Sequence, residues 1–224
     1  RRQLFANIAH ELRTPLAILQ GNLEGMIDDV IPCDKKMLLS MEDETLRLSR
    51  LVQDLRDLSL AEVNELVLHK KDVDMNTLLR RAVNMMEPLF DEKSLHLTIH
   101  LAESLPLAFM DPDRINQVIY NILNNALRYV PEGSAITIST ETAIQDGKEY
   151  VKTTISDTGP GINPDDLKQI FQYFYRGEKS RNRHSGGSGI GLALAKQFVI
   201  SHGGMMEAFS EEGKGTAFVF YIPL

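Results

Sequence analysis

Two long stretches of helical periodicity near the start of the chain constrain the fold more than any other feature. Apolar residues recur every three or four positions across residues 4–30, and the same spacing returns across residues 38–58, as expected for helices with one apolar stripe. Residues 31–34 interrupt the pattern, and Asp34 is a suitable N-cap for a second helix. The sequence therefore predicts a hairpin of two helices, each about 40 Å long at roughly 1.5 Å per residue.

The apolar stripes of such a hairpin are too long for one partner helix to cover. A second copy of the hairpin would cover them, because four-helix bundles bury stripes of this kind in a shared core. We therefore expect a homodimer built on a four-helix bundle. The alternative is a monomeric hairpin whose stripes pack against the rest of the chain.

The rest of the chain reads as a second domain of a different kind. After residue 62 the helical periodicity ends, and residues 63–74 have the pattern of a linker with one short strand. We therefore expect a helical dimerisation domain at residues 1–62, a linker at residues 63–74 and an α/β domain at residues 75–224.

Within the α/β domain, helical and strand patterns alternate without the regular β-α-β repeat of a doubly wound fold. Asp111 and Pro112 predict the start of a helix, and Asp146-Gly147 predicts a tight turn between two strands. The predicted fold class is α + α/β, with a helical hairpin followed by an α/β sandwich in which helices cover one face of a mixed sheet. The predicted helices cover residues 75–91, 112–130 and 189–201, and the predicted strands cover residues 95–101, 134–143, 149–157, 205–210 and 216–222.

Composition and charge exclude several classes of partner. Of the 224 residues, 43% are hydrophobic and 25% charged, as in a folded globular protein. The net charge of −7 argues against nucleic acid or anionic lipid as a partner. Cys33 is the only cysteine, which excludes an internal disulfide and fits a reducing compartment. Because no apolar run reaches the roughly 18 to 20 residues that span a bilayer, we expect a cytoplasmic fragment without direct membrane contact.

Three segments of the α/β domain carry side chains suited to a nucleotide. In the first, Asn121 and Asn125 lie one helical turn apart, and their amide oxygens are ligands that Mg²⁺ accepts. Arg128 and Tyr129 follow, a cation for phosphate and a ring for stacking. Taken alone, polar residues at this spacing also fit the solvated face of a helix.

The second segment follows a predicted strand directly. Asp157 there can accept a hydrogen bond from an exocyclic amine, and Gly159 and Gly161 let the backbone approach a flat ring closely. The alternative is an ordinary turn that needs its glycines for positive φ angles.

The third segment, residues 186–192, is rich in glycine and opens a predicted helix. Free N–H groups and the positive end of the helix dipole favour phosphate binding there. The pattern is superficially that of a dinucleotide site, but a polar loop precedes it where such a site needs a strand. That loop, residues 176–184, carries four Arg or Lys and no apolar residue. It either closes over phosphates as a lid or is an ordinary solvated loop.

The order of these segments resembles a known family, the sensor histidine kinases of bacterial two-component systems. Residues 5–16, which read FANIAHELRTPL with His10 at their centre, are similar to the H box of that family. The resemblance covers essentially the whole chain, although Gln172 and Tyr173 stand where the family often has Glu and Arg. The other boxes resembled, N, G1, F and G2, are Asn121-x3-Asn125-Ala126, Asp157-x-Gly159-x-Gly161, Phe171-x2-Phe174 and Gly187-x-Gly189-x-Gly191-Leu192.

The resemblance implies a chemistry for the first helix. In this family the H-box histidine accepts the γ-phosphoryl group of ATP, so a neutral His10 would attack phosphorus through a ring nitrogen. Glu11 would orient the ring or take up its proton. Thr14 matches the position associated with removal of phosphate from the partner. That partner would be a response-regulator receiver domain, whose aspartate takes the phosphoryl group from His10. The chain would then be the cytoplasmic part of a membrane-anchored sensor.

The resemblance also implies a site for ATP and Mg²⁺, of the fold shared by gyrase, chaperone and histidine kinase ATPases. Asn125 would hold Mg²⁺, and Asp157 would read the adenine amino group. The other implied contacts are Asn121, Arg128 and Arg176 at the phosphates, Tyr129 against the nucleotide, Gly159 and Gly161 around adenine, Gly187, Gly189, Gly191 and Leu192 in the G2 box, and Thr216 at the adenine end.

Two other classes of protein fit part of the pattern. A dimeric scaffold that has lost turnover would keep the fold, but intact His10, Glu11, Asn125 and Asp157 argue against it. An ATPase or a serine kinase on the same nucleotide fold would not need a histidine on a dimerising hairpin.

Overall fold

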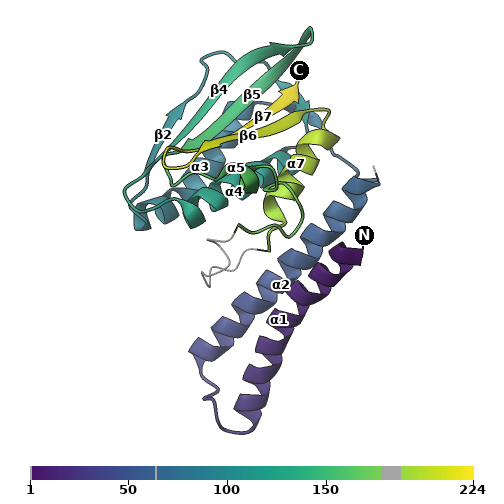
Figure 1. The fold of residues 1–224 in the computed structure, drawn as a ribbon, viewed down its shortest axis with the longest axis vertical. Coiled ribbons are helices and arrows are strands. Elements are labelled where there is room, and N and C mark those ends of the chain that lie inside the picture. Colours follow the sequence, from purple (N-terminus) through teal and green to yellow (C-terminus); the bar gives the residue numbers. More distant parts are fainter. Residues whose placement is uncertain (1, 64, 178–187) are drawn as a thin grey trace. The chain divides into compact units, whose positions relative to one another are not determined.

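The computed structural model describes residues 2–63, 65–177 and 188–224. The chain divides into two compact units, Arg1–Ser59 and Leu60–Leu224, and each is described by itself below (Figure 1).

The first unit is the predicted helical hairpin. Helix α1 (Arg2–Ile27) continues through Pro15, and helix α2 (Lys35–Glu62) follows a short turn. Asp34 caps α2, because its Oδ1 accepts the N–H of Met37 at 2.8 Å. Many large apolar side chains of the hairpin remain exposed in the single chain, among them Leu16, Ile18, Leu23, Leu38, Leu46 and Val52.

The second unit is an α/β sandwich. Its elements are β1 (Lys71–Val73), α3 (Met75–Glu92), β2 (His96–His100), β3 (Ala108–Met110), α4 (Pro112–Tyr129), β4 (Ala135–Gln145), β5 (Lys148–Asp157), α5 (Pro164–Leu167), α7 (Gly191–Ser201), β6 (Met205–Glu211) and β7 (Gly215–Pro223). The main sheet has five strands in the order β2-β4-β5-β7-β6. Strand β2 is parallel to β4, and the other pairs are antiparallel. Strands β1 and β3 form a separate antiparallel pair.

The core lies between the main sheet and helices α3, α4 and α7, which cover one face of it (Figure 1). Side chains alternate between the two faces of a strand, and the buried set on the helix side includes Ile138, Ile155 and Phe220. On the opposite face, the described residues include a small buried cluster of Tyr150, Val219 and Tyr221. This arrangement confirms the predicted mixed sheet with helices on one face.

Local sequence signals account for most element boundaries. Asp146 and Gly147 form the predicted turn, with φ angles of 50° and 76°, and His96 and His100 are exposed, as the alternation of β2 predicts. Strand β3 and the single turn α5 were not predicted. Both are too short to show a period, and β3 is a strand only because β1 pairs with it. Among the described residues, none of the helices combines the length and the hydropathy that a membrane span requires.

Candidate nucleotide site and phosphoacceptor helix

Helix α4 carries the two asparagines of the first predicted segment. Asn121 is half-buried, and its Nδ2 donates a hydrogen bond of 2.9 Å to the carbonyl oxygen of Gly191, the first residue of α7. Asn125, one turn later, is also half-buried, and its side chain makes no hydrogen bond within the described residues. The oxygen of Asn125 is therefore available to a ligand, whereas Asn121 also joins two helices.

The start of α4 is fixed by a buried aspartate. Asp111 caps the helix, since its Oδ1 accepts the N–H groups of Asp113 and Arg114 at 3.0 and 3.2 Å. Its other oxygen accepts the N–H of His69, in the segment before β1, at 2.8 Å. The capping role was predicted from sequence, and the contact with His69, 42 residues away, was not.

His202, at the end of α7, completes this junction. Its Nε2 accepts the backbone N–H of Asp111 at 3.0 Å, so the ring proton belongs on Nδ1, which lies 2.7 Å from the carbonyl oxygen of Phe198. Burial lowers the pKa of His202, and the positive charge of Lys70 acts in the same direction. A neutral His202 therefore links α7 to the cap of α4.

Asp157 ends β5 on the helix-covered face of the sheet, on the same side as Ile155. Its Oδ1 accepts the N–H of Gly159 at 2.8 Å, which bends the chain back toward the carboxylate. Burial raises the pKa of Asp157, against the lowering effect of the N–H groups of Gly159 and Thr216. Since a Cβ on Gly159 would lie 3.2 Å from Val130 at the end of α4, the loop packs on that helix end.

Thr216 lies beside Asp157 on β7, as the register of the two strands requires. It is buried, and its Oγ1 lies 2.9 Å from Oγ of Ser210 on β6. Ser210 Oγ also accepts the N–H of Ile162 at 2.8 Å, which anchors the loop after Asp157 to the sheet. Sequence reasoning missed Ser210, whose only signal would have been its place opposite Thr216 in a predicted hairpin.

The loop after Asp157 also needs glycine at position 161. Gly161 has a φ of 68°, and a Cβ there would lie 2.1 Å from the carbonyl oxygen of Glu211. The N–H of Gly213 donates to the carbonyl oxygen of Pro160 at 2.8 Å. The β6–β7 turn and this loop therefore meet backbone to backbone, and no side chain fits between them.

The F-box segment meets the G2 segment in the same manner. Phe174 has a φ of 61°, and its N–H donates to the carbonyl oxygen of Gly189 at 3.0 Å. A Cβ on Gly189 would lie 2.8 Å from the carbonyl carbon of Phe174. Phe171 packs edge-on against Phe218, and Nζ of Lys196 lies 4.6 Å from the Phe171 ring centre. The F box is thus held by both α7 and β7.

The predicted nucleotide residues therefore form two groups, joined by α4. Asn121, Gly189 and Gly191 meet at the start of α7, and Asp157, Gly159, Gly161 and Thr216 meet at the end of β5. Arg128, Tyr129, Arg176 and Leu192 are half-buried, and Gly187 lies outside the described residues.

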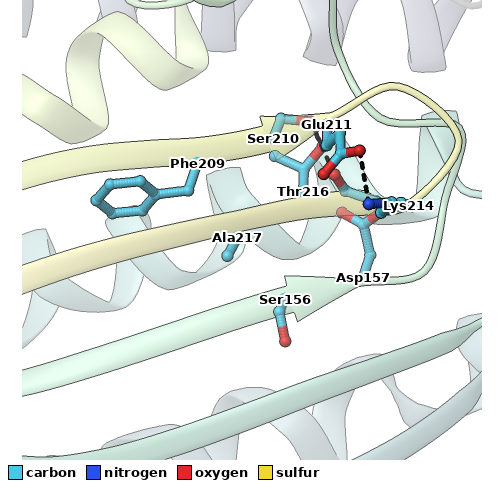
Figure 2. Close-up of a pocket in the computed structure, with 9 residues that line it drawn as sticks. Ser156, Asp157, Phe209, Ser210, Glu211, Lys214, Thr216 and Ala217 are labelled. Carbon is cyan, nitrogen blue, oxygen red and sulfur yellow. Dashed lines mark hydrogen bonds and ion pairs between the residues drawn. The ribbon is translucent and has the colours of Figure 1, made fainter.

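A cavity of about 530 Å³ lies at the same end of the sheet (Figure 2). Asp157, Thr216 and Ser210 are among its lining residues, but so are Ser156, Ala217 and Phe209. The second set occupies the alternate positions of the same strands and therefore faces the side that none of the described helices covers. The cavity thus opens mainly on the uncovered face, whereas Asp157 and Thr216 lie on the covered face.

The predicted phosphoacceptor lies on α1. His10 is exposed, Glu11 is half-buried, and Pro15 is buried one turn further on. The hydroxyl of Thr14, also exposed, donates to the carbonyl oxygen of His10 at 3.3 Å. An exposed imidazole beside a carboxylate can lose a proton and act as a nucleophile.

Comparisons with known proteins match both units. Residues 1–63 match the His Kinase A (phospho-acceptor) domain, and residues 110–224 match the histidine kinase-, DNA gyrase B- and HSP90-like ATPase family. The signal transduction histidine-protein kinase BaeS of Escherichia coli is 39% identical over the whole chain, which spans 47% of the length of that relative. The chain thus spans less than half of this curated relative.

Two solved structures have the same fold. The histidine kinase AdeS of Acinetobacter baumannii is 31% identical, with a TM-score of 0.79 over 96% of this chain and 97% of that one. The histidine kinase ThkA, solved in complex with the response regulator protein TrrA, is 23% identical, with a TM-score of 0.73 over 99% of this chain and 61% of that one.

The matches extend over the helical hairpin and the ATPase-type sandwich in the same order along the chain. Taken with the joined N and G2 segments and the histidine on α1, they establish that this chain belongs to the sensor histidine kinases of two-component systems.

Proposed function

We propose that this chain binds ATP with Mg²⁺ and transfers the γ-phosphoryl group to His10. The observation that carries the proposal is that three nucleotide segments meet at α4: Asn121 is bonded to Gly191, and the loop at Gly159 packs on Val130 at the end of the same helix. An exposed His10 followed by Glu11 supplies an acceptor on the other unit.

The nucleotide site proposed here has an adenine end and a phosphate end. Asp157 is half-buried with an acceptor oxygen, which suits the exocyclic amine of adenine, and Thr216, Gly159 and Gly161 shape that end. Arg128 and Arg176 supply positive charge for the phosphates, Tyr129 supplies a ring for the nucleotide, and the backbone at Gly187, Gly189, Gly191 and Leu192 supplies N–H donors.

The residues present fit a magnesium ion. Asn125 presents a half-buried amide oxygen that no described hydrogen bond occupies, and Asn121 lies one turn before it. Asn125 would hold the ion with phosphate oxygens and water as the other ligands. A bound Mg²⁺ would offset the negative charge of the phosphates.

In the proposed reaction, a ring nitrogen of neutral His10 forms a bond to the γ-phosphorus. The bond from that phosphorus to the bridging oxygen breaks, and ADP leaves with the electron pair. Glu11 orients the ring or accepts the proton displaced from it. The phosphoryl group then passes to a carboxylate oxygen of an aspartate on a response regulator, the class of partner that ThkA holds in its crystal structure. Thr14 contributes to the proposed opposing activity, in which the phosphoryl group is removed from the regulator by hydrolysis.

We also propose that the hairpin dimerises. Its exposed apolar side chains, such as Leu16, Leu23 and Leu46, are too many for a helix pair that remains alone in water. A second hairpin would bury them in a four-helix bundle. The proposed division is a dimerisation and phosphotransfer domain at residues 1–62, a linker at residues 63–74 and an ATP-binding domain at residues 75–224.

The length of the relatives supports a proposed setting for the chain. Because the chain spans less than half of BaeS, we propose that it is the cytoplasmic portion of a longer sensor anchored in a membrane. A signal received elsewhere in that protein would control labelling of His10.

The test is incubation of the purified chain with γ-labelled ATP and Mg²⁺. Two variants accompany it: His10→Gln, and His96→Gln, which removes an exposed histidine of the other unit. We expect acid-labile, alkali-stable label on the wild type and on His96→Gln, and none on His10→Gln.

Other outcomes would replace the proposal. Acid-stable label would favour a serine kinase, and phosphate release without label would favour an ATPase. ATP binding without label or hydrolysis would favour a scaffold that has lost turnover.

A further inference from the structure

A single carboxylate contacts the residues on both sides of Arg176. The hydroxyl of Tyr175 donates to Oδ1 of Asp166. On the other side of Arg176, a Cβ on Gly177 would lie 2.8 Å from Oδ2 of Asp166. Asp166 of α5 therefore bonds to the Tyr175 side chain and lies close to Gly177, although ten residues separate Asp166 from Arg176 in sequence.

Asp166 is itself held by two hydrogen bonds to Asn163. Its Oδ2 accepts a hydrogen bond of 2.8 Å from Nδ2 of Asn163, and its backbone N–H donates to Oδ1 of Asn163 at 2.8 Å. This reciprocal pair caps α5. Asn163 follows Ile162, whose N–H is bound to Ser210 of the main sheet. A chain of bonds thus runs from the sheet beside Asp157 to the position of Arg176.

The segment is also fixed on its N-terminal side, where the N–H of Phe174 donates to the carbonyl oxygen of Gly189. Phe174 holds a left-handed backbone conformation, with a φ of 61°, which costs free energy in a residue with a side chain. Strain of this kind persists only where surrounding contacts hold it, and Tyr175 and Asp166 supply such a contact at the next residue.

We infer that Asp166 and Tyr175 are positioning residues for Arg176. They fix the backbone of residues 174–177 before a nucleotide binds. Arg176 therefore loses less conformational freedom when its guanidinium group contacts the phosphates. This inference rests on the proposed function, because it takes Arg176 as a phosphate contact.

The inference predicts an effect that passes through Arg176. Tyr175→Phe removes one hydroxyl and keeps the ring. In the full chain it should weaken the binding of ATP with Mg²⁺ about three- to tenfold, a part of what a hydrogen bond to a charged group supplies. In an Arg176→Ala background the same substitution should have no further effect. It should also have no effect in an Asp166→Ala background, because the bond between Tyr175 and Asp166 is then already absent.

Affinity is measured by calorimetry with ATP and Mg²⁺ on chains that also carry His10→Gln, so that no phosphoryl group is transferred to position 10. The control is Tyr150→Phe, whose ring packs on the uncovered face of the sheet. The thermal midpoint of each variant is also recorded, to detect a loss of folding stability. A tyrosine with a merely structural role would lower the affinity for ATP equally in both Arg176 backgrounds. Equal losses there, or unchanged affinity in Tyr175→Phe alone, overturn the inference.

The same experiment separates this inference from the proposed function. If ATP binds but the chain with His10 takes up no label, the proposed function fails, and the calorimetric comparison still decides the role of Tyr175. If His10 is labelled while Tyr175→Phe binds ATP as tightly as the wild type, the inference alone fails.

Discussion

The side-chain amide of Asn121 donates a hydrogen bond of 2.9 Å to the carbonyl oxygen of Gly191. The bond ties the middle of α4 to the first turn of α7, where N–H groups point out of the helix end. The space is tight, because a Cβ on Gly191 would lie 3.2 Å from Oδ1 of Asn121. The two segments with the strongest proposed link to phosphates are therefore fixed to each other before a nucleotide arrives.

Replacement of Asn121 by aspartate should disrupt this junction. A carboxylate cannot donate to the Gly191 carbonyl and brings a negative charge toward the phosphates. We expect the free energy of unfolding to fall by about 1–3 kcal/mol, the usual cost of a buried polar group left without a partner, and ATP binding to fall at least about tenfold, a loss of roughly 1.4 kcal/mol. Urea unfolding and calorimetry check both. Asn124→Asp, at an exposed position of the same helix, should change neither, and equal behaviour of the two variants would contradict the proposed role.

At neutral pH, Asp157 should lower the folding stability of the chain and strengthen its binding of ATP. Its pKa in the folded chain is raised by burial, so folding favours the protonated form. The contribution of Asp157 to stability is therefore present at low pH and is lost as pH rises through the raised pKa. At neutral pH the ionised carboxylate costs stability, while it supplies the proposed acceptor for adenine.

Asp157→Asn should therefore unfold at the same or a higher urea concentration than the wild type at pH 7.5, yet bind ATP at least about tenfold more weakly. The amide keeps an oxygen for the N–H of Gly159 but presents a donor to the adenine amine. Asp146→Asn is the control, since Asp146 lies in an exposed turn with a positive φ that asparagine tolerates. Wild-type ATP affinity in Asp157→Asn would count against the adenine assignment.

Gly161 and Gly147 offer a matched pair for the backbone contact near Asp157. Both have positive φ angles, of 68° and 76°, but a Cβ at Gly161 would lie 2.1 Å from the Glu211 carbonyl oxygen, and a Cβ at Gly147 would meet nothing within 4 Å. Alanine at position 147 should cost only the conformational strain, about 1–2 kcal/mol. Alanine at position 161 should cost more and should also weaken ATP binding. Similar unfolding midpoints for the two variants would show that the backbone at Glu211 moves to accommodate the added methyl group at little cost in free energy.

His202 should make the second unit sensitive to acid. Its pKa is lowered from 6.5 by burial, so the unfolded chain binds a proton at a higher pH than the folded chain does. The stability from neutral His202 is present above pH 6.5 and is lost as pH falls toward the folded pKa. Between those two values the free energy of unfolding should fall by up to about 1.4 kcal/mol per pH unit.

The control for His202 is His202→Gln, whose side chain does not titrate. Urea unfolding of the two proteins from pH 7.5 to pH 5 should give a smaller slope for the variant. The same slope in both would assign the acid sensitivity to other groups.

Local chemistry explains what could be predicted from sequence. Caps and turns could be predicted because they depend on residues close together in sequence. The examples are Asp34, Asp111 and the pair Asp146-Gly147. Helical and strand periods likewise identified the hairpin and the mixed sheet, because burial repeats along each element.

What could not be predicted depends on partners distant in sequence. Ser210 acts on Ile162, 48 residues away, and His202 acts on Asp111, 91 residues away. Their positions become informative only once strand register and helix packing are known. Asp166 is a similar case, since its role depends on the path of the chain after Phe174.

The place of β7 in the sheet has a consequence for how the protein is made. This strand is the last element of the chain described here, yet it lies between β5 and β6 and brings Thr216 beside Asp157. On a translating ribosome, β4 and β5 can pair as a hairpin early, but the edge of β5 stays open until residues 215–223 have left the exit tunnel. Until β7 is inserted, the proposed adenine end lacks Thr216, and a nucleotide that binds there cannot assist folding.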